Sequence, residues 1–330
     1  MKKIGIYGVG AVGGLCAARL AQAGYAVAAC ARGETLKKLQ TQGIGLKDKE
    51  SGQISYFPVQ ASNDPAELGV QDVVIIAVKA TGLHDIASKI APMIGPNTLI
   101  LSAMNGVPWW FFEMPDVALH GTRLRALDAD GAIAKALPWQ QVIGCVVHLS
   151  SFCPEPGVVQ VAMGNRLIIG EPVGGASDRV AQLAQVLSSA GFEVEQSAEI
   201  RHQVWYKLWG NMTTNPISAL TAATADKMLD DALVRQFSLD VMAEAAIIGA
   251  RIGCPIAQSG EDRMVITRSL GALRTSMLQD MEAGKALEID ALIGVVHEIG
   301  QLLDIKTPNI AALFGLARLF GRMHGLYPQA

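Results

Sequence analysis

The sequence has 330 residues, of which half are hydrophobic, and its formal net charge is −3. This length suggests two domains, and the near-neutral charge gives no general attraction to nucleic acid or to an anionic membrane. The five cysteines form no C-x-x-C pair and are odd in number, so we expect reduced thiols in a cytoplasmic protein. No stretch is long enough to span a membrane without a charge or proline.

A glycine motif follows the first predicted strand. Residues 4–7 are apolar, Gly8, Gly10 and Gly13 come next, and a Leu- and Ala-rich helix is predicted over 15–23. In this context Gly8 makes the tight turn, Gly10 lets a pyrophosphate approach, and Gly13 lets helix and strand pack closely. The helix N-terminus favours phosphate. We therefore predict a dinucleotide site over Gly8, Val9, Gly10, Ala11, Val12 and Gly13, rather than an ordinary βα turn.

The residue after the second strand indicates which dinucleotide binds. The strand is predicted over 25–31, and Arg32 stands where NAD-binding proteins usually place an acid. A guanidinium there can hold a 2′-phosphate, whereas Glu34 falls beyond the strand end. NADPH is therefore favoured over NADH, and the alternative for Arg32 is a solvated surface charge.

Three further strands are predicted over 54–59, 72–79 and 98–103, with a helix over 83–90. The run over 72–79 is almost continuously apolar, as in a parallel strand buried on both faces. Lys79 and Asn105 end the last two strands, where ligands gather in open α/β sheets. This alternation predicts a Rossmann-type, doubly wound sheet.

The stretch from 107 to 141 begins with four consecutive aromatic residues, Trp109 to Phe112. We interpret them as a local core plug or a subunit contact rather than a substrate wall. A strand follows over 142–149. Strands over 158–161 and 167–170 flank Met163-Gly164-Asn165, which we predict to be a hairpin turn.

The remaining α/β elements are a helix over 178–187 and a short strand over 192–195. After about residue 198 the sequence takes on helical periodicity, as over 234–250 and 286–303. We predict an α/β domain over 1–198 and an all-helical domain over 199–330.

The helical half opens with a polar stripe. Lys207, Asn211 and Asn215 are spaced i, i+4, i+8, so one helix face would carry all three. Pro216 disfavours helix at Asn215, which is expected where the helix ends or kinks. The stripe combines a proton donor with two amides among apolar neighbours, and its alternative is a solvated helix face.

A second polar cluster includes Ser276 and Asp280 on one helical face, and Glu288 beyond Gly284. A carboxylate such as Glu288 could orient the Lys207 ammonium, while Ser276 offers a hydroxyl to a carboxylate substrate. The histidines show no paired metal-ligand spacing, so no metal is expected. There is no G-x-S-x-G elbow for acyl transfer.

Taken together, the sequence resembles the ketopantoate reductases (2-dehydropantoate 2-reductases) from the first glycine motif to about Pro308. The pieces that carry this resemblance are Gly8/Gly10/Gly13, Arg32, Val78-Lys79, Asn105-Gly106, Lys207 with Asn211 and Asn215-Pro216, TSMLQD at 275–280 and Glu288-Ile289-Asp290.

The resemblance implies a domain that holds NADPH, followed by a helical domain similar to that of the 6-phosphogluconate dehydrogenase group. It implies that Lys207 protonates the carbonyl oxygen of ketopantoate as hydride arrives, and that Glu288 positions Lys207 and contacts the cofactor. Substrate would be held by Asn211, Asn215 and Ser276, with Asn105 at the nicotinamide end and Lys79 near the cofactor. The pathway implied is pantothenate and coenzyme A synthesis.

The segment over 109–140 looks longer and more aromatic than is usual in the family, so it could reshape the pocket. Two alternatives therefore stay open: an NADP-dependent reductase of another small 2-oxo acid, and a non-catalytic protein that senses NADP(H). The intact polar set argues against the sensor. An exposed aromatic run and apolar helices are compatible with a homodimer.

Overall fold

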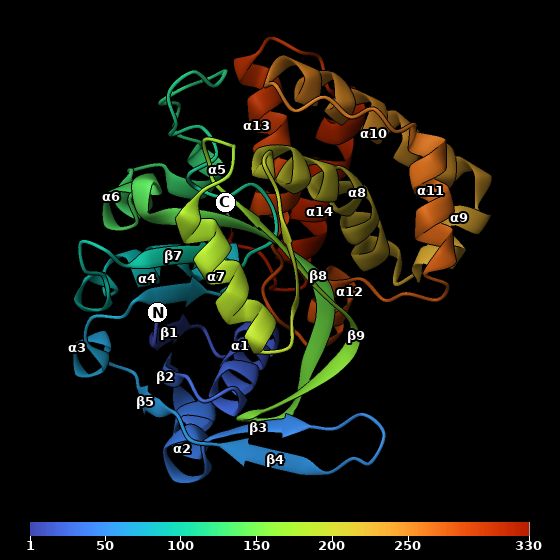
Figure 1. The fold of residues 1–330 in the computed structure, drawn as a ribbon. Coiled ribbons are helices and arrows are strands. Elements are labelled where there is room, and N and C mark those ends of the chain that lie inside the picture. The colour runs from blue at the N-terminus through green and yellow to red at the C-terminus, as the bar shows by residue number, and fades with distance from the viewer. Residues whose placement is uncertain (330) are drawn as a thin grey trace. The chain divides into compact units, whose positions relative to one another are not determined.

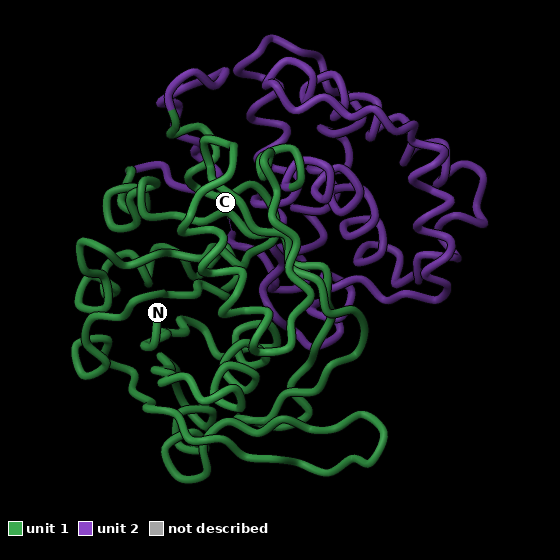
Figure 2. The backbone as a smooth tube through the Cα atoms, in the orientation of Figure 1, with its two compact units in different colours: residues 1–114, 131–203 green, residues 115–130, 204–330 purple. Residues whose placement is uncertain are grey.

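The computed structural model describes residues 1–329 and divides the chain into two compact units. The first comprises 1–114 and 131–203, and the second comprises 115–130 and 204–330 (Figure 2). The segment 115–130 thus belongs with the helical unit, although it lies within the α/β part of the sequence. The domain boundary after residue 198 stays a prediction.

The first unit is built on one mixed sheet (Figure 1). Its parallel centre contains β1 (Lys3–Tyr7), β2 (Ala26–Cys30), β6 (Val73–Ile76) and β7 (Leu99–Ser102). The remaining strands are β3 (Ile44–Lys47), β4 (Ile54–Phe57), β5 (Gln60–Ser62), β8 (Val142–Glu155), β9 (Val158–Gly170) and β10 (Glu193–Gln196). In the part of the chain that the structure describes, the order is β4-β3-β9-β8-β7-β6-β1-β2-β5, with β10 beside β9.

The predicted α/β architecture is confirmed, and the pairs β3–β4 and β8–β9 add antiparallel strands to it. The helices of this unit are α1 (Ala11–Gln22), α2 (Gly33–Gln42), α3 (Pro65–Leu68), α4 (Leu83–Ala87), α6 (Ala132–Ala136) and α7 (Asp178–Ser189). Short 3₁₀ turns are η1 (Ala80–Gly82), η2 (Ala91–Met93) and η3 (Trp139–Gln141). The core lies where α1 packs on the sheet, as with Leu15 and Leu20 against the buried strands.

The hairpin turn predicted at Met163-Gly164-Asn165 is wrong, because β9 runs through it without interruption. Gly164 has φ +72°, but it lies opposite Leu149 at a point where the β8–β9 register shifts. Glycine with positive φ serves a β-bulge as well as a turn. The chain instead reverses at residues 156–157, where Gly157 has φ +78°.

The four aromatic residues Trp109 to Phe112 are buried, with at most 7% of any side chain exposed. The indole of Trp109 donates to the Leu137 carbonyl at 2.9 Å, and that of Trp110 donates to the Ser102 hydroxyl at 3.0 Å. The predicted core plug is therefore confirmed, and the expectation of an exposed aromatic run is wrong. The residues lie in successive turns rather than a regular element, so all four can point inward.

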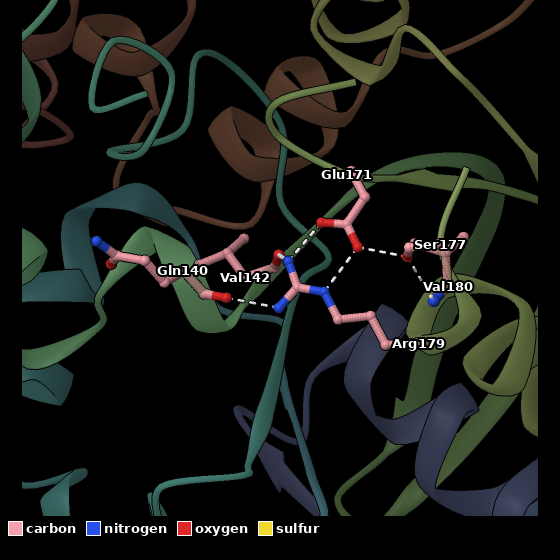
Figure 3. A network of polar contacts seen from close by, with 6 residues as sticks. All are labelled: Gln140, Val142, Glu171, Ser177, Arg179 and Val180. Carbon is pink, nitrogen blue, oxygen red and sulfur yellow. Dashed lines mark hydrogen bonds and ion pairs between the residues drawn. The ribbon is translucent and has the colours of Figure 1, made fainter. Parts of the chain in front are cut away.

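An ion pair between the buried Glu171 and the half-buried Arg179 connects the end of β9 to α7 (Figure 3). Arg179 Nε donates to Glu171 at 2.6 Å, and its Nη1 donates to the Gln140 carbonyl at 2.5 Å. Ser177 Oγ donates to the same carboxylate at 2.5 Å. Burial tends to raise the pKa of Glu171, but the hydrogen bonds from Arg179 and Ser177 outweigh it and hold the pKa below its usual value.

The second unit is helical, as predicted. Its elements are α5 (Arg125–Asp128), α8 (Ile200–Thr221, the first residues of which belong to the first unit), α9 (Ala225–Asp230), α10 (Ala232–Arg251), α11 (Gly260–Ser269), α12 (Ser276–Glu282), the π-helical turn η4 (Asp290–Gly294), α13 (Val295–Leu302) and α14 (Pro308–Met323). Within residues 1–329, no helix combines the length and the hydropathy that crossing a membrane requires.

Of the two possibilities for Asn215, an end or a kink of the helix, the end is wrong, because α8 continues past Pro216 to Thr221. Proline in a helix interior removes a backbone hydrogen bond. Around it, however, Met212, Thr213 and Ser218 are completely buried. Tertiary packing of α8 therefore outweighs the local cost.

Candidate functional site

The glycine turn between β1 and α1 has the shape that a dinucleotide requires. Gly8 has φ +94°, and a Cβ there would lie 2.4 Å from Val78 Cγ1. A Cβ on Gly13 would lie 2.0 Å from the Gly8 carbonyl oxygen, so the turn and helix can approach only if this residue is glycine. By contrast, nothing lies within 4 Å of the Cβ position on Gly10. A side chain would therefore have space at Gly10, whereas neighbouring atoms fill that space at Gly8 and Gly13.

The N-terminus of α1 is also suited to an anion. Gly10 is its N-cap residue, no side chain caps it, and no acidic residue stands in its first turn. Helix N-termini attract phosphate through their N–H groups and positive dipole end. The residues from Gly8 to Gly13 therefore fit the pyrophosphate of a nicotinamide dinucleotide.

Arg32 lies directly beyond β2, as the N-cap residue of α2, and 81% of its side chain is exposed. Its Nη1 is 3.2 Å from Asp85 Oδ2. The competing acid, Glu34, accepts a hydrogen bond from Lys37 at 2.7 Å. Arg32 thus presents its guanidinium to solvent at the strand end where a ribose 2′-substituent is expected.

Lys79 and Asn105 follow adjacent parallel strands. Register aligns Tyr7 with Ile76 and Ile76 with Ser102, so β1, β6 and β7 end at one edge of the sheet. Lys79 is the N-cap residue of η1, and Asn105 lies three residues beyond β7. Both are half-buried. Gly8, Lys79 and Asn105 therefore share the sheet edge where ligands bind in such folds.

The polar stripe lies on α8, where Lys207 and Asn211 are half-buried and Asn215 is 4% exposed. Asn215 Nδ2 donates to Ser276 Oγ across 3.5 Å, a long hydrogen bond. Ser276 is the first residue of α12, which Thr275 caps by accepting a hydrogen bond from Leu278 N at 3.2 Å. Two residues predicted to bind substrate are thus brought together from separate helices.

Glu288 stands just before the π-helical turn η4 and is half-buried. Its carbonyl accepts a hydrogen bond from Leu292 N at 3.2 Å. Two residues later, Asp290 accepts a hydrogen bond from the Tyr327 hydroxyl at 2.7 Å. Burial raises the pKa of Asp290, and burial together with Asp290 raises the pKa of Tyr327 to about 12. The direct pairing of Glu288 with Lys207 stays a prediction.

Sequence reasoning missed two acidic residues that organise these regions. Glu298 on α13 accepts hydrogen bonds from the backbone N–H groups of Arg125 and Ala126 at 2.6 and 2.9 Å, so it holds the start of α5. No local sequence pattern predicts a contact between residues this far apart in the sequence. The second is Asp85, which pairs with Arg32 and with Lys89. The i, i+4 spacing of Asp85 and Lys89 was the available signal.

The chain matches known proteins over nearly all of its length. Residues 4–174 match the family described as Ketopantoate reductase PanE/ApbA, and residues 199–320 match its C-terminal part. A 2-dehydropantoate 2-reductase of Mesorhizobium japonicum is 40% identical over 326 residues, covering 98% of this chain and 99% of the relative. One from a Nostoc species is 26% identical, covering 95% and 93%.

Among solved structures, a protein from Ralstonia solanacearum MolK2, described provisionally as a ketopantoate reductase, is 54% identical. Its TM-score is 0.95, with 99% of each chain covered. This protein belongs to the ketopantoate reductase PanE/ApbA family.

Proposed function

We propose that this protein is a 2-dehydropantoate 2-reductase, which uses NADPH to reduce ketopantoate to pantoate for pantothenate and coenzyme A synthesis. The full-length identity of 40% to a relative of that name is the observation that carries the proposal. The open backbone at Gly10 and the contact between Asn215 and Ser276 support it independently, because a reductase needs both a dinucleotide site and a substrate site.

The cofactor, when bound, supplies hydride from its nicotinamide ring. The turn from Gly8 to Gly13, with the N-terminus of α1, would hold its pyrophosphate. Arg32 would hold the 2′-phosphate that distinguishes NADPH from NADH. Lys79 and Asn105 would contact the cofactor, with Asn105 at the nicotinamide end.

Lys207 acts as the general acid. Its ammonium donates a hydrogen bond to the ketone oxygen of the substrate, stabilises the negative charge that grows there, and then transfers its proton to that oxygen. Glu288 positions the Lys207 ammonium and contacts the cofactor. General acid catalysis of this kind is worth about 100- to 10,000-fold in rate.

The substrate is held by donors from two helices. The amides of Asn211 and Asn215 and the hydroxyl of Ser276 hydrogen-bond its carboxylate and hydroxyl groups. Asn215 is buried in the middle of α8, so its amide is held in place before substrate arrives. Such preorganisation lowers the entropy lost on binding.

A substrate panel tests the proposal against its two alternatives. Ketopantoate should give the highest kcat/KM with NADPH among small 2-oxo acids of graded size. A ketopantoate value near the bottom of the panel would favour a reductase of another 2-oxo acid. Tight NADPH binding without turnover of any 2-oxo acid would favour the NADP(H) sensor. A cytoplasmic location stays our expectation, and the apolar helices are compatible with a homodimer.

A further inference from the structure

Three charged side chains form a cluster at the end of β2. Asp85, on α4, pairs through Oδ2 with Arg32 Nη1 at 3.2 Å and through Oδ1 with Lys89 Nζ at 2.6 Å. Each carboxylate oxygen therefore binds a different cation. We refer to Arg32, Asp85 and Lys89 as the Arg32–Asp85–Lys89 cluster.

The cluster is accessible to a ligand. The side chains of Arg32, Asp85 and Lys89 are 81%, 44% and 52% exposed. Next to Arg32, Gly33 opens helix α2 with φ +59°, and nothing lies within 4 Å of its Cβ position. The N-cap residue of α2 thus supplies one of two cations that share Asp85, and two neighbouring cations suit a phosphate group.

The carboxylate in this cluster is ionised at neutral pH. The hydrogen bond from Lys89, with the charges of Lys89 and Arg32, holds the pKa of Asp85 below its usual value. The cluster therefore carries a net charge of about +1 at neutral pH. Within it, Asp85 is the one group that would repel a phosphate.

We propose that Asp85 is a cofactor-specificity residue: it holds Arg32 and Lys89 as their counter-ion until a 2′-phosphate takes both cations. This inference rests on the proposed use of a nicotinamide dinucleotide. Lys89 then becomes the second cation on the phosphate beside Arg32. When the ribose carries a free 2′-hydroxyl, as in NADH, Asp85 instead accepts a hydrogen bond from it.

Arg32 and Lys89 interact more favourably with a 2′-phosphate than with Asp85. Exposed ion pairs such as these are individually weak, whereas a phosphate carries nearly two charges and three acceptor oxygens. Yet Asp85 stays near and repels the phosphate, which lowers the affinity for NADPH. The same carboxylate raises the affinity for NADH, because it accepts a hydrogen bond from the 2′-hydroxyl. Asp85 thus reduces the difference in affinity between the two cofactors.

Binding measurements with purified full-length protein test this without any turnover. In Asp85→Asn we expect NADPH to bind about two- to fivefold more tightly and NADH to bind more weakly, as expected for loss of one exposed charge interaction. In Lys89→Gln we expect NADPH binding to weaken by a similar factor while NADH binding stays unchanged. The fragments 2′,5′-ADP and 5′-AMP should follow NADPH and NADH, respectively.

Glu195→Gln is the matched control, because Glu195 is 45% exposed and pairs with Arg166 at 3.3 Å in the same unit. It should change neither cofactor's affinity. Equal changes for NADPH and NADH in Asp85→Asn, or weaker NADPH binding in it, would overturn the inference. If the wild-type protein bound neither dinucleotide, the proposed function itself would fail. Thermal unfolding shows whether each variant is folded, and Lys89→Gln tests the cluster separately.

Discussion

The side chains of Asn215 and Ser276 lie 3.5 Å apart, from Nδ2 to Oγ, although they are 61 positions apart in the sequence. Asn215 is held in the interior of α8, and Ser276 is held at the capped start of α12. The amide and the hydroxyl therefore form one preorganised donor pair in the helical unit.

Replacing Ser276 by Ala should raise KM for the 2-oxo acid by about tenfold, because one hydrogen bond to a charged carboxylate is lost. The affinity for NADPH should not change. Steady-state kinetics and cofactor titration measure the two effects. Ser269→Ala is the control, since Ser269 on α11 donates to the Ile266 carbonyl at 2.7 Å and is exposed. An unchanged KM in Ser276→Ala would remove this hydroxyl from the substrate site.

Replacing glycine by alanine should have different effects at two positions of the glycine turn. Gly13→Ala should destabilise the fold by about 3 kcal/mol, because its Cβ would meet the Gly8 carbonyl oxygen at 2.0 Å. Gly10→Ala should leave stability nearly unchanged, since its Cβ position is open, and should weaken dinucleotide binding. Denaturant unfolding and cofactor titration distinguish the two. Similar stability losses in both variants would contradict the division of roles.

Replacing Lys207 by Ala should lower kcat by about 100- to 10,000-fold, because the developing charge on the ketone oxygen loses its acid. NADPH affinity should change little. Lys227→Ala, which removes an exposed lysine from α9, provides the matched control. Turnover in Lys207→Ala at the wild-type rate would exclude Lys207 as the proton donor.

Replacing Arg179 by Ala should destabilise the protein by about 3 kcal/mol at neutral pH, because the Glu171 carboxylate would stay buried without its partner. The folded-state pKa of Glu171 is lowered, so its contribution is complete above the unfolded-state pKa and is lost as pH falls through the folded-state pKa. The difference between wild type and Arg179→Ala should therefore shrink below pH 4.5 or so. Unfolding curves across pH measure it, and a constant difference would contradict the assignment.

Local pattern was enough to predict the α/β fold and the helical second half. The strands β1, β6 and β7 are short apolar runs, and Gly8, Lys79 and Asn105 follow them within three residues. Parallel strands bring such ends to one edge of the sheet. Likewise, the i, i+4, i+8 spacing of Lys207, Asn211 and Asn215 was enough to predict that they share one face of a helix. These features depend on residues near one another in sequence.

The sequence-based predictions failed where contacts between residues far apart in the sequence determine the local structure. Gly164 has the positive φ of a turn residue, but pairing with Leu149 makes it part of a bulge. Pro216 lies inside α8 because packing around it outweighs its local cost. The hydrogen bonds that Glu298 accepts from the backbone N–H groups of Arg125 and Ala126 depend on the fold as a whole.

We propose above all that this protein reduces ketopantoate with NADPH. The most direct measurement is NADPH consumption, followed by absorbance, with ketopantoate as substrate, together with the amount of pantoate formed and a parallel assay with NADH. We predict one pantoate for each NADPH consumed, at a rate well above that with NADH. NADPH binding with no pantoate formed would contradict the account.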